Sequence, residues 1–279
     1  MSDYQESPPK DRGFKYRIGI LLVVFAAVAG FVVWFNIVQP PKLIKLRDET
    51  LRQWGIQNPF EKESEIIIIN AEDVPEADRE SDAQIAQKIE EMGLLVVKDS
   101  STKLANVIHV TKGKASEELF KWITQLKYVN AINAEEAGVT DELCKYLETQ
   151  TMVRSLSMGR NPLTSEALKS LSKMELITGM YLRECQITGE NLELLANLKE
   201  LKILDLSGSK FTNEDMKKIA GCKTIHWLLL NDVGIDDEGL MYLAEMPELR
   251  HLTILRGNNI TPEGAKKIRS MAKNDLTVD

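Results

Sequence analysis

A repeat of 24 residues constrains the fold of this chain more than any other feature of its sequence. Each copy has three apolar positions, of which the second lies three residues after the first and the third lies two residues after the second. The first position falls at residues 105, 129, 153, 177, 201, 225 and 249, and an eighth copy begins at Leu276 and Val278. A unit of this size cannot bury its own apolar face, so neighbouring copies must stack on one another. The sequence therefore predicts a solenoid.

The second half of each unit carries a helix start signal. An apolar residue is followed directly by Ser, Thr or Asp, and Glu comes two residues after that. The Ser, Thr or Asp oxygen accepts a hydrogen bond from an exposed amide of the first helical turn, and Glu meets the positive end of the helix dipole. The predicted N-cap residues are Ser116, Thr140, Thr164, Thr188, Thr212, Asp236 and Thr261. Each unit is expected to be a strand, a turn, a capped helix and a second turn.

This arrangement resembles the leucine-rich-repeat family over residues 105–279. The stretches 201–219 (LKILDLSGSKFTNEDMKKI) and 225–243 are most similar to the ribonuclease-inhibitor-like class. The resemblance implies an α/β leucine-rich-repeat solenoid that binds proteins, with a parallel sheet on its concave side and helices on its convex side. The position three residues after the third apolar strand position usually holds Asn or Cys in the family. Here it holds Asn161, Cys185 and Ser209 but also Gly113, Ala137 and Val233. We therefore expect a weaker hydrogen-bond ladder between some units.

An apolar run of 21 residues, 18–38, precedes the repeats and contains no charged side chain. As a helix it would be about 31 Å long, close to the thickness of a bilayer's hydrocarbon core. We predict a single transmembrane helix that anchors the chain in a membrane. A cleaved signal peptide is the alternative, because Ala27-Val28-Ala29 has the form of a cleavage site. The run continues to Val38, which favours an uncleaved anchor.

The chain is thus predicted to have five parts. They are an N-terminal tail (1–17), the transmembrane helix (18–38), a juxtamembrane amphipathic helix or stalk (39–60), an α/β cap (61–104) and the repeat domain (105–279). The cap is expected to contain buried strands at 66–69 and 94–97 and a helix that begins at Ser81-Asp82. The basic residues before the transmembrane run lie closer to it than those after it, which favours a cytoplasmic tail and an extracytoplasmic repeat domain.

Charge and motifs exclude several function classes. The chain carries a net charge of −7, and residues 1–60 carry +3 of it, so residues 61–279 carry −10. So acidic a domain repels phosphate and does not suit a nucleic-acid partner. The three cysteines lack metal-ligand spacing, and neither H-E-x-x-H nor G-x-S-x-G occurs. We therefore predict no metal, no cofactor and no enzymatic activity.

Candidate binding residues come from the strand pattern. Side chains alternate along a strand, so the residues between the apolar positions should point to the concave face. The first three units offer small or polar residues there, whereas the last four offer large ones. The predicted partner-binding residues are Tyr181, Arg183, Ile203, Asp205, Trp227, Leu229, His251 and Leu255. Exposed Trp, Tyr and Arg are typical of interaction hot spots, which indicates a protein or peptide ligand.

Three alternatives stay open at this point. Trp227 and Leu229 could pack against neighbouring strands without any partner. The chain could be a structural envelope scaffold that self-associates through an exposed strand edge at Asp275–Asp279. A substrate adaptor similar to F-box repeat proteins is the third, although no F-box-like helical segment precedes the repeats and the membrane anchor counts against it.

Overall fold

The structure is a computed structural model that describes residues 74–99, 102–254 and 256–279. The predicted tail (1–17), transmembrane helix (18–38) and stalk (39–60) lie outside the described residues, as does the predicted strand 66–69. Within the described part, no helix is long and apolar enough to cross a membrane.

The described strands form one sheet in which spatial order follows chain order. The strands are β1 (Leu95–Lys98), β2 (Ala105–His109), β3 (Ala131–Asn133), β4 (Ser155–Ser157), β5 (Gly179–Tyr181), β6 (Ile203–Asp205), β7 (Trp227–Leu229), β8 (His251–Thr253) and β9 (Thr277–Val278). β1 is antiparallel to β2, and every later pair is parallel. From β2 to β8, paired residues are 24 positions apart, as the repeat predicts. Val278 pairs with Leu252, 26 positions earlier, so the predicted period is wrong by two residues in the last unit.

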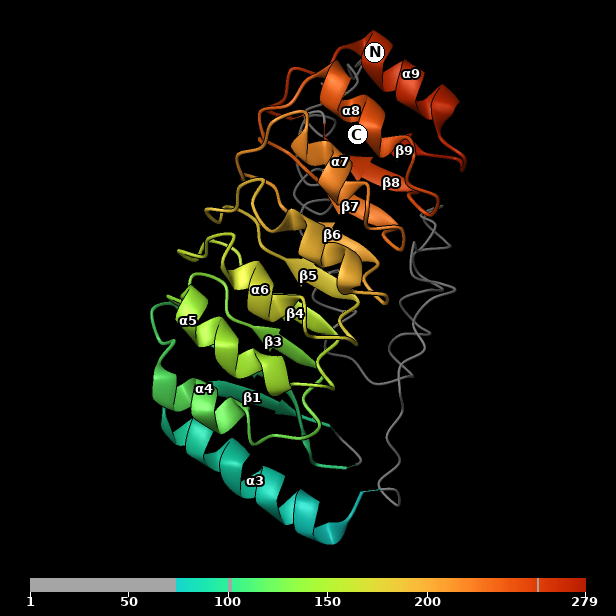
Figure 1. Cartoon of the computed structure of the whole chain (residues 1–279). Coiled ribbons are helices and arrows are strands. Elements are labelled where there is room, and N and C mark those ends of the chain that lie inside the picture. Colours follow the sequence, from blue (N-terminus) through green and yellow to red (C-terminus); the bar gives the residue numbers. More distant parts are fainter. Residues whose placement is uncertain (1–73, 100–101, 255) are drawn as a thin grey trace, which may run out of the picture. The chain divides into compact units, whose positions relative to one another are not determined.

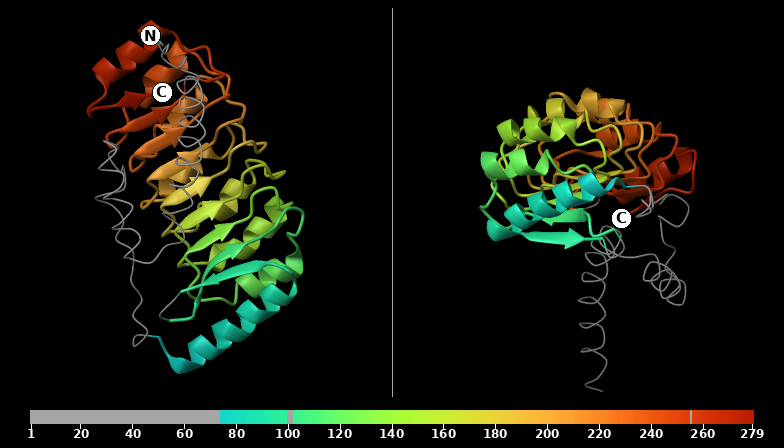
Figure 2. Two further views of the ribbon diagram at one scale, coloured as in Figure 1. Left: turned by 180° about the vertical axis from the view of Figure 1, so that it is seen from behind. Right: turned by 90° about the horizontal axis from the view of Figure 1, so that it is seen from below.

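Helical segments line one face of this sheet, one or two per unit (Figure 1). They are α3 (Glu76–Glu91), α4 (Glu117–Ile123), α5 (Asp141–Cys144), the 3-10 helix η2 (Lys145–Thr149), α6 (Ala167–Leu171), the 3-10 helix η3 (Leu192–Asn197), α7 (Asp215–Ile219), α8 (Asp237–Leu243) and α9 (Pro262–Met271). From behind, the strands lie in front of the helices (Figure 2, left). We call the sheet face opposite the helices the concave face.

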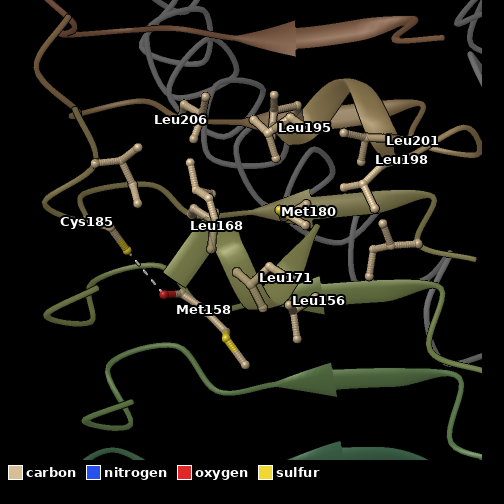
Figure 3. Packing of buried hydrophobic residues seen from close by; sticks show 14 of the residues in the cluster. Leu156, Met158, Leu168, Leu171, Met180, Cys185, Leu195, Leu198, Leu201 and Leu206 are labelled. Atoms are coloured by element: carbon tan, nitrogen blue, oxygen red, sulfur yellow. Dashed lines mark hydrogen bonds between the residues drawn. The ribbon is translucent and has the colours of Figure 1, made fainter. Parts of the chain in front are cut away.

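The core lies between the sheet and the helices. All three apolar strand positions are buried in each of the seven complete units, which confirms the repeat pattern. Leu156 and Met180 project from successive strands towards Leu168 and Leu171 of α6 (Figure 3). Each unit adds one apolar layer that covers its neighbour, as a solenoid requires.

The prediction of a capped helix in every unit is wrong for most of them. Only Ser116, Asp236 and Thr261 accept a hydrogen bond from the first turn of an α-helix that starts directly after them. The other four predicted caps are Thr140, Thr164, Thr188 and Thr212. Thr140 precedes α5 without such a bond, and α6, η3 and α7 begin three or four residues after their predicted caps. The hydroxyls of Thr164 and Thr212 donate instead to Asp141 and Asp215.

The cap also differs from prediction. Its helix, α3, begins at Glu76 rather than at Ser81-Asp82, because Glu76 and Asp78 follow Pro75 and favour a helix start there. β1 runs from Leu95 to Lys98, and Leu95 is 58% exposed, so this strand is not fully buried. It is the outermost described strand, and α3 packs against only one of its faces.

Hydrogen bonds between units follow the expected uneven ladder. The Asn161 amide accepts from Gly138 N and Val139 N and donates to Ala134 O and Met158 O. Cys185 donates only to Met158 O, and the buried Ser209 hydroxyl has no partner among the described residues (Figure 3).

Sequence reasoning missed Asn258, which acts like Asn161 one residue later in its unit. Its amide accepts from Val233 N, Gly234 N and Ile235 N and donates to Leu230 O and Ile254 O. The cap Thr261 lies 25 rather than 24 residues after Asp236. That one-residue shift is the signal that could have revealed Asn258.

Candidate binding surface on the concave face

Parallel register arranges the candidate residues in two rows across the concave face. Ile203, Trp227 and His251 are paired neighbours in one row, and Tyr181, Asp205 and Leu229 are paired neighbours in the other. Side chains at these positions lie opposite the buried positions Met180, Leu204, Leu228 and Leu252. The structure therefore brings six of the predicted binding residues together. Leu255 lies outside the described residues.

Exposure divides these residues. Tyr181, Trp227, Leu229 and His251 are half-buried, as is Arg183. Ile203 is only 9% exposed and Asp205 only 8% exposed, so the prediction that both lie open to solvent is wrong. Asp205 lies between Tyr181 and Leu229, and Ile203 lies next to Trp227, so larger neighbours cover them. We call Tyr181, Ile203, Trp227, Leu229 and His251 the aromatic patch.

Trp227 is held in place by the next strand. Its indole Nε1 donates to Thr253 Oγ1 at 3.2 Å, and its ring centroid lies 5.9 Å from that of His251 at an interplanar angle of 54°. Burial lowers the pKa of His251, so its imidazole is neutral at pH 7. The ring therefore offers partners a fixed, uncharged surface.

Glycines explain why Tyr181 and Arg183 lie flat on the sheet. A Cβ atom at Gly179 would be 3.2 Å from Cε2 of Tyr181, and one at Gly159 would be 2.8 Å from Cγ of Arg183. The two side chains thus occupy space that any other residue would fill. Burial raises the pKa of Tyr181, which keeps its hydroxyl protonated. Gly159 and Gly179 thus shape this part of the concave face.

Arg183 is engaged within the solenoid. Its Nε donates to Glu135 Oε1 at 2.9 Å, two units away. Arg160 forms a parallel bridge at the same edge, to Glu184 at 3.1 Å and Glu136 at 3.3 Å. Arg183 is therefore already paired with a carboxylate of its own chain.

Asp205 is a buried carboxylate on the same face. Its Oδ1 accepts from Ser207 N at 3.0 Å. Burial raises the pKa of Asp205, and the Ser207 N–H opposes this only in part. We therefore assign Asp205 to the local turn after β6.

The concave face extends beyond the predicted residues at its N-terminal end. Leu95 and Val97 of β1 pair with His109 and Val107 of β2, so they share their face. This apolar extension was missed because β1 is antiparallel and lies outside the 24-residue period. The alternation of Leu95 and Val97 with buried Val96 is the signal that could have found it.

The described residues contain no group of three or more His, Cys, Asp or Glu side chains that could hold a metal ion. All three cysteines, Cys144, Cys185 and Cys222, are buried and unpaired by disulfides. Burial raises the pKa of the Cys222 thiol to about 12, so it stays protonated and unreactive at neutral pH. Packing accounts for these residues.

Comparison with known proteins agrees with the repeat. The family model described as Leucine Rich repeat matches residues 199–220 and 248–268. An internalin (InlF) structure from Listeria monocytogenes is similar at 17% identity with a TM-score of 0.48; the match covers 65% of this chain and 50% of that one. An internalin C2 structure from the same organism is similar at 17% identity with a TM-score of 0.43, covering 71% and 92%. The chain therefore spans half the length of the InlF structure, and no curated protein matches it.

Three observations agree on the family. The sequence repeats every 24 residues, the strands pair in that register, and a family model matches two of the units. This chain therefore contains leucine-rich repeats.

Proposed function

We propose that this chain is a membrane-anchored, non-enzymatic interaction module, built from ribonuclease-inhibitor-like repeats, whose concave face binds a protein or a peptide. The observation that carries the proposal is the aromatic patch, which gathers large side chains from four neighbouring strands on the face opposite the helices. Trp and Tyr supply much of the binding energy in protein interfaces. The leucine-rich-repeat fold supports the same role.

The patch is ordered before any partner arrives. Trp227 is hydrogen-bonded to Thr253, and Tyr181 lies against Gly179. Side chains that are already held lose little conformational entropy on binding, which favours affinity. The same contacts show that Trp227 packs on its neighbours in the absence of a partner. Its ring is only half-buried, so it can also contact a partner.

The test compares aromatic residues on the two faces. The full chain is immobilised, and captured partners are compared between the wild type, a Trp227→Ala/Tyr181→Ala variant and a Trp122→Ala/Tyr242→Ala variant. Trp122 and Tyr242 are half-buried aromatic residues of α4 and α8, so they control for the loss of aromatic area. We expect the concave variant to lose capture while its circular dichroism spectrum is unchanged, and the helix-side variant to retain capture. Equal capture by all three would overturn the proposal.

The membrane part of the proposal depends on residues 18–38. Their uncharged length and the basic residues before them support an anchor with the repeat domain outside the cytoplasm. Protease added to intact cells should remove a C-terminal tag, while a cytoplasmic marker stays intact. A tag that is cut only after lysis would place the repeats in the cytoplasm and refute this topology.

A further inference from the structure

One position in each unit forms a row beside the aromatic patch. It lies directly before the row that contains Ile203, Trp227 and His251. In successive units it holds Asn106, Asn130, Arg154, Thr178, Lys202, His226 and Arg250. Backbone bonds keep the row in register, for example from Thr178 N to Arg154 O at 2.7 Å and from Lys202 N to Thr178 O at 2.8 Å. The row contains several basic residues and no acidic one, although the domain as a whole is acidic.

Arg154 and Lys202 differ from the other cations that the structure describes. The half-buried cationic side chains of the described part are Arg79, Arg154, Arg183 and Lys202. Arg79 donates to Val74 O and Arg183 to Glu135, whereas the side chains of Arg154 and Lys202 have no hydrogen bond or ion pair with any described residue. The Nε atom of Arg154 is fully buried and has no acceptor among the described residues, which costs free energy. The rest of this half-buried guanidinium is open to solvent, where a carboxylate can pair with it.

The two cations are placed to share one anion. Neighbouring strands are about 4.8 Å apart, so two units separate Arg154 and Lys202 by about 10 Å. Both side chains are long enough to reach a point midway, over Thr178. The hydroxyl of Thr178 is turned towards the backbone, where it donates to Arg154 O at 3.0 Å. The Tyr181 ring lies beside this point, over Gly179.

The surroundings select the kind of anion. A polyanion such as nucleic acid would be repelled by a domain whose charge is −10. A single carboxylate on a polypeptide avoids that repulsion and pairs well with a guanidinium. Ile203 and Trp227 lie on the next strands, so residues beside the carboxylate would meet an apolar surface.

We propose, resting on the proposed function, that the partner of the concave face is a protein segment with an acidic side chain beside aromatic or aliphatic ones. Its carboxylate pairs with Arg154 and Lys202. Its apolar side chains pack on the aromatic patch.

The experiment selects peptides without assuming a natural partner. A random dodecapeptide library is panned against the immobilised full chain, against an Arg154→Gln/Lys202→Gln variant and against a Lys114→Gln/Lys210→Gln control. Lys114 and Lys210 are exposed, and the control removes the same charge elsewhere. The wild type and the control should both enrich Asp or Glu within a few positions of Trp, Phe or Leu. The Arg154→Gln/Lys202→Gln variant should lose the acidic preference and keep the apolar one.

Peptide affinities then test the pairing of the carboxylate with Arg154 and Lys202. Replacing the acid of a selected peptide by its amide should raise the Kd on the wild type by about 10-fold or more, since hydrogen bonds to charged groups are the stronger ones. The same replacement should change the Kd on the Arg154→Gln/Lys202→Gln variant by less than about 2-fold. Trp227-dependent peptides that lack an acidic preference would overturn this inference and leave the proposed function standing. A selection with no peptide whose binding depends on Trp227 would overturn both.

Discussion

Replacing Asn161 by alanine should cost more stability than replacing Asn258, although each amide makes five hydrogen bonds. The difference lies in burial. Asn161 is 3% exposed, whereas Asn258 is half-buried. Water already reaches the Asn258 side chain and can follow into the space that its amide leaves, whereas Asn161 is closed off from water.

The magnitude follows from the partners left behind. Val139 N is buried and has only Asn161 as acceptor, so it becomes an orphaned donor at about 1–3 kcal/mol. The carbonyls of Ala134 and Met158 keep weaker donors at 3.3 and 3.4 Å, so each loses about 0.5–1.5 kcal/mol. Asn161→Ala should therefore cost about 2–6 kcal/mol, and Asn258→Ala about 1 kcal/mol.

Urea unfolding of the full chain, followed by far-UV circular dichroism, measures both costs. Asn133→Ala is the control, because the Asn133 side chain only accepts from Glu135 N at 3.3 Å, and it should change stability by less than about 0.5 kcal/mol. Equal costs for Asn161→Ala and Asn258→Ala would show that bond number, not burial, determines stability. A cost below about 1 kcal/mol for Asn161→Ala would refute the reasoning outright.

Two further predictions concern a close contact and a buried carboxylate. Gly239→Ala places a Cβ atom 2.5 Å from Asn213 Oδ1 and should destabilise the fold by about 1–3 kcal/mol in thermal melts, whereas in an Asn213→Ala background the cost should be smaller, because only the Asn213 Cα atom at 3.1 Å stays close. An equal cost in both backgrounds would contradict the clash. Asp205→Asn should raise the Tm at pH 7, because burial raises the pKa of Asp205 in the folded chain and the amide can still accept from Ser207 N. That gain should disappear as the pH falls below the ordinary pKa of 3.8, where the carboxyl is protonated in both states; a gain independent of pH would rule out ionisation as its cause.

The period of the sequence was sufficient to place strands β2 to β8. Every predicted apolar strand position of the seven complete units is buried, and the predicted concave residues of β5 to β8 form two rows. The physical reason is local: an extended chain alternates its side chains, and a repeat that must stack keeps its apolar side towards the core. The leucine-rich-repeat fold and the face of the six candidate residues in β5 to β8 could therefore be predicted from sequence.

The stacking of the units decided which hydrogen-bond partner each side chain has. The Thr164 hydroxyl accepts from Glu166 N of its own unit and also donates to Asp141 of the preceding unit, 23 residues away. Arg183 finds Glu135 across 48 residues, while Arg154 finds no described partner at all. A periodic sequence predicts which face of the sheet each side chain lies on. The choice among hydrogen-bond partners depends on the distances between units. Those distances exist only after the units have packed, so the burial of Asp205, the pairing of Arg183 and the unpaired cations beside the aromatic patch are properties of the tertiary structure.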